Sequence, residues 1–369
     1  MWFGTCAILL LTLTIALGQE APWEKHVKEA IRLEDSGRYK EARALYQLAL
    51  QGEETASDSG VRKATTLNNL GLVNRRLGNY AEARELYQRA LALFESARGV
   101  HSAEYATVLQ NLGLLNCHQG QLDEASRVLQ RALAIREKTT GPGTAASTAE
   151  TLASLASVRE LQGRNGVADR LYRRALAIEE KELGPEPSYI IANTLSNLAE
   201  LYIRRRQFEA ALDLRQRAYL IMRKAYGDEH PRTSLSMNYL AIAYAHLKRF
   251  REAEELMGRA LAIQLDTFGE NSLEAAQTMN NLGVVCFQQG RLEEAEKLWR
   301  RSLPIYERAQ ASSKLAKGLL NYASLLRKTG RKSEAKNIES RARAVSLAVQ
   351  GNDWERFSVD VSELLMLGK

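Results

Sequence analysis

The side chains that most often carry chemistry are few in this chain of 369 residues. The histidines are His26, His101, His118, His230 and His246, and the cysteines are Cys6, Cys117 and Cys286. None of them has the spacing of a His-Glu-x-x-His or Cys-x-x-Cys metal site. Cys117 and His118 are adjacent, and neighbours on a helix point about 100° apart, so they do not form a nucleophile and its base. The chain also contains no Gly-rich phosphate loop and no Gly-x-Ser-x-Gly elbow. We therefore expect a protein that is not an enzyme and needs no cofactor or metal.

A motif that recurs about every 42 residues organises the chain instead. Its turn position is occupied by Gly37, Gly78, Gly120, Gly163, Arg206, Lys248, Gly290 and Gly330. The small residues after these turns are Ala42, Ala83, Ala125, Ala168, Ala211, Ala253, Ala295 and Ala335, then Ala49, Ala90, Ala132, Ala175, Ala218, Ala260, Ser302 and Ala342. A spacing of seven puts both small residues on one helix face, where two helices approach closely. The period predicts an all-α, right-handed α-solenoid of about eight helix-turn-helix units.

The pattern from Leu70 to Ala90 resembles the tetratricopeptide repeat, with Leu-Gly, a Gly-x-Tyr-x-x-Ala turn, then Tyr and Ala. The longer period is similar to the subtype in kinesin light chain and nephrocystin-3. Ala175 to Pro187 and Tyr226 to Pro231 carry this finer resemblance. It covers roughly residues 25 to 345 and specifies the fold, but not the biological role. No heptad-rich segment precedes the repeats, so a motor subunit is not expected.

The repeats depart from the family pattern at two kinds of place. Arg206 and Lys248 replace the turn glycine, so these turns should close differently or with strain. The Gly-Pro-x-His-Pro connector is degraded at His101-Ser102, at Thr139 to Ala145 and at Glu270 to Ser272.

The resemblance implies a concave groove lined by the first helix of each unit. The groove residues carried over from the family pattern are Asn68, Asn69, Arg76, Asn111, Asn197, Arg204, Asn238, Asn280, Asn281, Asn321 and Arg327. A row of amides can pair with the backbone of an extended peptide, and it can equally bond to adjacent units of the stack. Arginines toward both ends, with Glu150, Glu160 and Glu200 between them, favour a partner segment with acidic flanks.

The first eighteen residues resemble a secretory signal peptide. They carry no charged side chain, and Ala16 and Gly18 are small residues suited to cleavage before Gln19. This predicts a secreted or periplasmic protein, with an uncleaved N-terminal membrane anchor as the alternative. No second run of spanning length follows, so no membrane association is expected after cleavage. Cys117 and Cys286 lie four units apart, too far for an internal disulfide.

We divide the chain into the signal peptide 1–18, the solenoid 19–350 and the C-terminal tail 351–369. The tail breaks the period and is too apolar for a free end, and Val359 and Val361 alternate with polar residues as in a short strand. It would cap the last unit, or alternatively bind a partner as a strand.

Composition narrows the class of partner. The formal net charge is +7, but aromatic residues make up only 7% of the chain and lie mostly at packing positions, which argues against nucleic acid. We expect an exported scaffold that binds an extended peptide or a partner surface in its concave groove. The alternative is a self-associating structural or assembly factor of the cell envelope, and the oligomeric state stays open.

Overall fold

The computed structural model describes residues 21–35, 38–53, 60–139, 143–184 and 188–348. The predicted signal peptide, the tail 351–369 with its strand, and the turn at Gly37 lie outside these residues. The helices are α2 (Pro22–Asp35), α3 (Tyr39–Glu53), α4 (Gly60–Arg76), α5 (Tyr80–Arg98), α6 (Ala103–His118), α7 (Leu122–Arg136), α8 (Thr144–Leu161), α9 (Asn165–Leu183), α10 (Tyr189–Arg204), α11 (Phe208–Tyr226), α12 (Pro231–His246), α13 (Phe250–Phe268), α14 (Leu273–Gln288), α15 (Leu292–Arg308), α16 (Ser312–Lys328) and α17 (Lys332–Ala348). Within the described residues the fold is all-α, as predicted.

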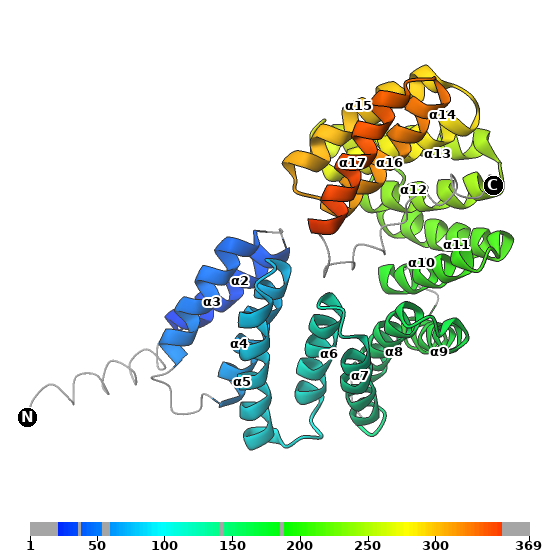
Figure 1. Cartoon of the computed structure of the whole chain (residues 1–369). Helices are drawn as coiled ribbons and strands as arrows, with labels where there is room; N and C mark the ends of the chain where they lie inside the picture. The colour runs from blue at the N-terminus through cyan, green and yellow to red at the C-terminus, as the bar shows by residue number, and fades with distance from the viewer. Residues whose placement is uncertain (1–20, 36–37, 54–59, 140–142, 185–187, 349–369) are drawn as a thin grey trace, which may run out of the picture. The chain divides into compact units, whose positions relative to one another are not determined.

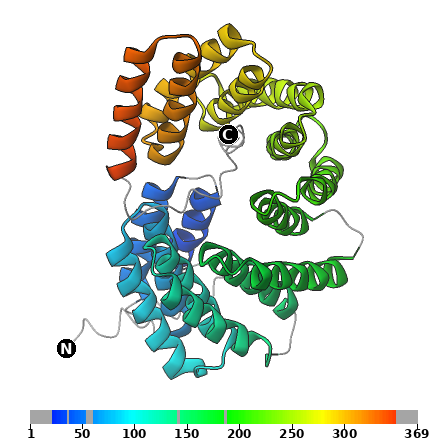
Figure 2. The ribbon, with the colours of Figure 1, turned by 45° about the vertical axis from the view of Figure 1, so that its right-hand side comes forward.

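The helices form eight successive pairs, with even-numbered first helices and odd-numbered second helices (Figure 1). Chain contacts divide the molecule into unit 1, residues 1–154, and unit 2, residues 155–369, with the boundary inside α8. In both units first helices pack against the second helix of their own pair, as α4 does on α5 and α16 on α17. Figure 2 shows α16 and α17 side by side at the red end of the chain.

The turn within each pair depends on one residue in the left-handed conformation. Gly78 has φ 81°, and the following Asn79 N–H donates to the Asn74 carbonyl at 2.9 Å. Arg206 and Lys248 adopt φ 59° and 60°, and each is followed by the equivalent bond, here at 2.8 Å and 2.9 Å. These turns therefore close as the glycine turns do, and the non-glycine residues carry the expected backbone strain.

The connectors between pairs keep their capping function despite their altered sequence. Ser102 and Ser272 accept hydrogen bonds at 3.3 Å from the N–H groups of Tyr105 and Ala275, as serine N-caps do. His230 caps α12 in the same way through Nδ1, which accepts from the Arg232 N–H at 3.1 Å. At these two degraded connectors a serine thus has the capping role that His230 has before α12.

The small residues of the motif allow close packing within a pair. A Cβ built on Gly71 would lie 2.7 Å from Tyr87 Cε1, and one on Gly283 would lie 2.8 Å from Trp299 Nε1. Both alanine positions of each second helix are buried wherever the structure describes them, the serine at 302 included. The motif therefore specifies contacts inside a pair and with the next one.

None of the helices in the described residues is long and apolar enough to cross a bilayer.

Candidate functional site

First helices lie closer to one another than second helices do. In unit 1, α4 contacts α6, and in unit 2, α12 contacts α14 and α14 contacts α16. Among the described helices, no two second helices make a comparable contact. Closer spacing on this side is what a stack has on its inner surface, so in each unit separately we call the surface formed by its even-numbered helices the first-helix face.

The asparagines of the first-helix face join one repeat to the next. Asn111 Nδ2 donates to Asn68 Oδ1 at 2.8 Å in unit 1. In unit 2, Asn281 donates to Asn238 at 3.4 Å, and Asn321 donates to Asn280 at 3.2 Å. In each bond the donor lies nine residues before its turn position and the acceptor ten residues before the preceding turn. We call this pair of positions the amide joint.

Most of these asparagines are buried and so have little surface to offer a ligand. Asn238, Asn280, Asn281 and Asn321 are at most 3% exposed, and Asn68 and Asn111 are 8% exposed. Asn69 and Asn197 are half-buried and remain accessible on the face. Contact of these residues with a peptide stays a prediction, whereas bonding between adjacent repeats is seen directly.

Two arginines in unit 1 give the face a positive charge. Arg75 Nη1 lies 2.8 Å from His118 Nε2, and Arg76, the next residue, is exposed. Burial and the charges of Arg75 and Arg76 lower the pKa of His118 to about 3, so the imidazole is neutral and accepts from Arg75. No carboxylate forms an ion pair with either arginine among the residues that the structure describes. Within the described part of the chain, their charge is therefore not opposed by a paired carboxylate.

The corresponding arginine in unit 2 is engaged by two carboxylates. Arg204 Nε lies 3.3 Å from Glu160 Oε1 and 3.4 Å from Glu200 Oε1, so it links α8 to its own helix α10. Glu160 is 5% exposed. Burial raises its pKa to about 7, in spite of the opposing effect of Arg204. The acceptor position of the preceding repeat, which would pair with Asn197, holds Ala153, whose side chain has no amide. The ion pairs of Arg204 therefore take the place of an amide joint between α8 and α10.

Sequence reasoning missed a buried arginine in the fifth repeat. Its position, nine residues after the turn, holds fully buried Tyr87, Tyr172 and Trp299 in three other repeats but Arg215 here. Arg215 Nη2 lies 3.4 Å from Glu200 Oε2, and its guanidinium lies 4.7 Å from the centre of the Tyr239 ring. The available signal was a charged residue at a position that is Tyr, Leu, Met or Trp in six of the other seven repeats, the last repeat having Glu339 there.

A second missed arginine joins repeats in unit 1. Arg136 is 4% exposed, and its Nη1 donates to Gln110 Oε1 at 2.5 Å and also to Thr151. Thr151 Oγ1 in turn donates to Gln110 at 2.8 Å. This polar contact replaces an amide joint between α6 and α8.

The basic residue at the far end of the chain is also neutralised. Arg327 is exposed, but its Nε and Nη2 bind both oxygens of Glu339 at 2.5 Å and 2.7 Å. Lys328, beside it, lies 4.8 Å from the centre of the Phe287 ring. Of the three arginines predicted to line the groove, Arg76 is thus the one whose charge is not opposed by a paired carboxylate in the described residues.

Cys117 and Cys286 are buried. Burial raises the pKa of Cys117 to about 12 and that of Cys286 to about 11, the opposite of the shift that activates a nucleophile. The described residues contain no group of three or more His, Cys, Asp or Glu side chains that could hold a metal ion.

Known proteins with this architecture are plentiful among solved structures. BtubC (BKLC) from P. vanneervenii is 22% identical over 64% of this chain and 92% of its own, with a TM-score of 0.50. A putative kinesin light chain from Podosopora anserina with nearly identical TPR-like repeats is 23% identical over 57% and 99%, with a TM-score of 0.49. The apo form of RapI is 13% identical over 79% and 100%, with a TM-score of 0.57. Identities this low concern the fold alone.

No curated protein matches the chain, so the family is assigned from family models. One model described as tetratricopeptide repeat matches residues 30–95, 62–138, 190–266 and 268–348, and a second with the same description matches residues 151–186. These segments cover well over half of the sequence. The chain therefore belongs to the tetratricopeptide repeat family.

Proposed function

We propose that this protein is an exported interaction scaffold that binds an acidic, extended segment of a partner protein on the first-helix face of unit 1. Tetratricopeptide repeats generally bind protein partners, and successive first helices of unit 1 offer a surface for such a partner. The observation that carries the proposal is the pair Arg75 and Arg76, whose charges lie beside a neutral histidine and no paired carboxylate.

The chemistry of this surface matches an extended acidic chain. Arg76 is exposed and offers a guanidinium that can bind a carboxylate with two parallel bonds. Seven residues before Arg76 on the same helix, or about two turns, the half-buried amide of Asn69 offers a donor and an acceptor to a peptide backbone. The arginines of unit 2 at 204 and 327 are already paired, so they contribute less to a partner's affinity.

A charge-reversal experiment tests the site. Arg76→Glu should weaken binding of a fluorescent peptide with glutamates at both ends by about tenfold at low salt, and the salt dependence of binding should fall. Arg89→Glu is the matched control, because Arg89 is exposed on the second helix of the same repeat and the net charge changes equally. The same peptide with glutamines in place of the glutamates should bind weakly to all three proteins.

Three outcomes would contradict the proposal. Equal loss in both variants would mean that only net charge matters, and no loss in either would mean that the peptide binds elsewhere. A glutamine peptide that binds as tightly as the glutamate peptide would remove the role of acidity. Crosslinking from the native compartment, with Arg76→Glu and Asn69→Ala in parallel, then identifies the partner.

Export rests on the sequence of residues 1–18 and has its own test. The mature protein should be found outside the cytoplasm with an N-terminus at Gln19, which mass spectrometry of the N-terminal peptide detects. An intact leader in the membrane fraction would instead indicate the N-terminal anchor.

A further inference from the structure

Three second helices contact the first helix of the next pair through one polar residue. This residue lies sixteen positions after the turn, and its partner is a threonine twelve positions before the next turn. The three contacts are those of Arg136 with Thr151, Glu179 with Thr194, and Gln264 with Thr278. The same register position therefore holds a cation, a carboxyl group and an amide in three different repeats.

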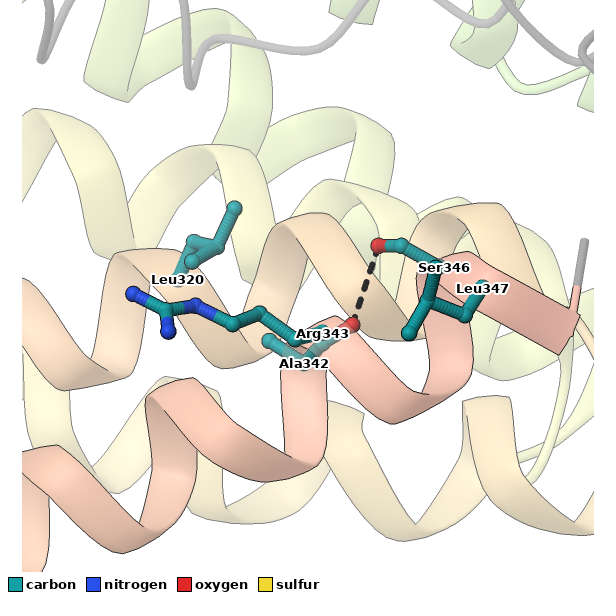
Figure 3. Close-up of a pocket in the computed structure, with 5 residues that line it drawn as sticks. All are labelled: Leu320, Ala342, Arg343, Ser346 and Leu347. Carbon is teal, nitrogen blue, oxygen red and sulfur yellow. Dashed lines mark hydrogen bonds between the residues drawn. The ribbon is translucent and has the colours of Figure 1, made fainter. Parts of the chain in front are cut away.

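In the last described pair the same position makes a different bond. Its residue, Ser346, lies in a pocket lined also by Leu320 and Leu347. Figure 3 shows the Ser346 hydroxyl, which donates to the Ala342 carbonyl of its own helix at 2.9 Å. Among the described residues no further first helix follows α17. The threonine contacts are therefore a property of the junctions between pairs, where a following helix supplies the partner.

The contact made by Gln264 is satisfied without any charge. Gln264 is 1% exposed, and its Oε1 accepts from the Thr278 hydroxyl at 2.7 Å. Its Nε2 donates to the Ser234 hydroxyl at 3.3 Å. An amide offers a donor and an acceptor and does not titrate, so this link from α13 to α14 is the same at every physiological pH.

The equivalent contact made by Glu179 is not satisfied in this way. Glu179 is also 1% exposed, and its Oε1 accepts from Thr194 Oγ1 at 2.9 Å. Its Oε2 is buried and has no hydrogen-bond partner among the residues that the structure describes. Burial of an ionised carboxylate with one neutral donor is costly, whereas a protonated carboxyl group carries no charge. The closed contact between α9 and α10 thus favours the protonated form.

The groups around Glu179 do not supply a compensating cation. Burial raises its pKa to about 7, against the hydrogen bond from Thr194 of α10, and the charge of Glu180 on its own helix adds to the rise. The cation nearby, Arg217 of α11, is paired with Glu180. The other buried carboxyl group at this junction, Glu160 of α8, contacts Arg204 near the C-terminal end of α10. Each of the two carboxyl groups therefore titrates against its own surroundings.

We propose that the contact between α9 and α10 is controlled by a proton: it is closed while Glu179 is protonated and weakened once this carboxyl group ionises. Ionisation leaves a negative charge between two packed helices with one hydroxyl donor, and opening of the contact returns that charge to water. The stabilising effect of the proton is fully present below the pKa of the open form. It is lost as pH rises through the pKa of the closed form, which is about 7. The junction between the fourth and fifth repeats thus loosens toward alkaline pH.

Hydrogen exchange of the full chain at about pH 6 and about pH 8, corrected for the exchange rates of unstructured amides, tests the proposal. The equilibrium constant for opening of residues 176–182 and 190–197 should rise about tenfold between these conditions. This is the change for a carboxyl group with a pKa of about 7 in the closed contact and an ordinary pKa in the open one. Residues 261–267 and 275–281 are the internal control, because the contact of Gln264 does not titrate, and their opening should change by less than about twofold.

Glu179→Gln is the matched variant, because it gives the fourth repeat the side chain that already works at Gln264. The rise in opening at residues 176–182 and 190–197 should disappear in this variant. Unchanged protection of residues 261–267 shows that the variant is folded. Glu160→Gln is the control for the second carboxyl group and should leave the rise at residues 176–182 in place.

Three results would overturn the proposal. The first is opening of residues 176–182 that does not change between the two pH values in the wild-type chain. The second is an equal rise at the Gln264 contact, which would indicate a general effect of pH. The third is a rise that survives Glu179→Gln. The comparison of the two junctions in the wild-type chain needs no substitution, so it decides the matter even where a variant folds poorly. Arg76→Glu should leave the rise unchanged, so the result is independent of the partner site.

Discussion

Addition of a single methyl group at Gly283 should separate the packing role of the motif glycine from its helix propensity. A Cβ there would lie 2.8 Å from Nε1, 3.0 Å from Cε2 and 3.2 Å from Cδ1 of Trp299. The indole is fully buried, and its N–H donates to the Asn280 carbonyl at 3.1 Å, so it has no free direction in which to move. Gly283→Ala therefore forces the ring against its neighbours.

The size of the stability change caused by Gly283→Ala follows from opposing effects. Replacing glycine by alanine in a helix interior stabilises by about 1 kcal/mol. Overpacking costs about 1–3 kcal/mol, and loss of the indole hydrogen bond costs about 1 kcal/mol more. We expect a net loss of about 1–3 kcal/mol in the free energy of opening of α14 and α15.

Gly258→Ala is the matched control on α13. No atom lies within 4 Å of the Cβ position there, so only the helix propensity changes. This variant should gain up to about 1 kcal/mol. Hydrogen exchange measures both, because local opening energies remain defined in a repeat array whose global unfolding is not two-state.

A second substitution tests the cause. The sixth repeat places Ala241 and the buried Met257 at the positions of Gly283 and Trp299. Trp299→Met should therefore restore tolerance of Gly283→Ala, with a coupling energy of about 1 kcal/mol or more in the double-mutant cycle. If Gly283→Ala and Gly258→Ala stabilise equally, contact with the indole does not limit this position and the reasoning fails.

Three further predictions concern single features. Arg206→Gly and Lys248→Gly should each stabilise by about 0.5–1 kcal/mol in urea titrations, because relief of left-handed strain outweighs the greater freedom of glycine in the unfolded chain; a loss would contradict the strain. Burial raises the pKa of Glu160 to about 7, so the folded state binds its proton more tightly than the unfolded state does. The contribution of this carboxyl to folding stability is fully present below its pKa in the unfolded state and is lost as pH rises toward 7. Glu160→Gln should flatten the fall in the urea midpoint between about pH 5 and 8, and an unchanged slope would exclude this carboxyl as a cause. Thiol-reactive reagents at pH 8 should modify Cys117 and Cys286 only after denaturant is added, and fast modification of the native chain would contradict their burial.

The sequence predicted the contacts that repeat and missed those that do not. Alanines at fixed spacing predict close helix pairs, and the structure buries them because small residues have one packing role in any repeat. The turns at Arg206 and Lys248 also followed from the register alone. A further left-handed residue, Gln310 with φ 53°, was missed, although the spacing of 40 residues between Gly290 and Gly330 shows a shorter connection there.

Partners between repeats were harder to predict, because they depend on which rotamers meet across an interface. An asparagine on a first helix has the same sequence signature whether it faces a peptide or the neighbouring amide, and only the structure shows that Asn111 bonds to Asn68 at 2.8 Å. Arg136 gave no such signal, since an arginine near the end of a second helix is ordinarily a solvated charge.

The amide joint bears on how such a chain can lengthen. Duplication of the repeat formed by α14 and α15 would place a copy of Asn281 against Asn280, so the new junction would keep its hydrogen bond. Duplication of the repeat formed by α10 and α11 would set a copy of Asn197 against Ser196 and separate Glu160 from one of the two Arg204 copies. Growth by repeat copying is therefore permitted by hydrogen-bond chemistry in the seventh repeat and penalised in the fifth. The seventh repeat can therefore be copied with its junction hydrogen bond intact, whereas a copy of the fifth repeat loses the contacts at its junction.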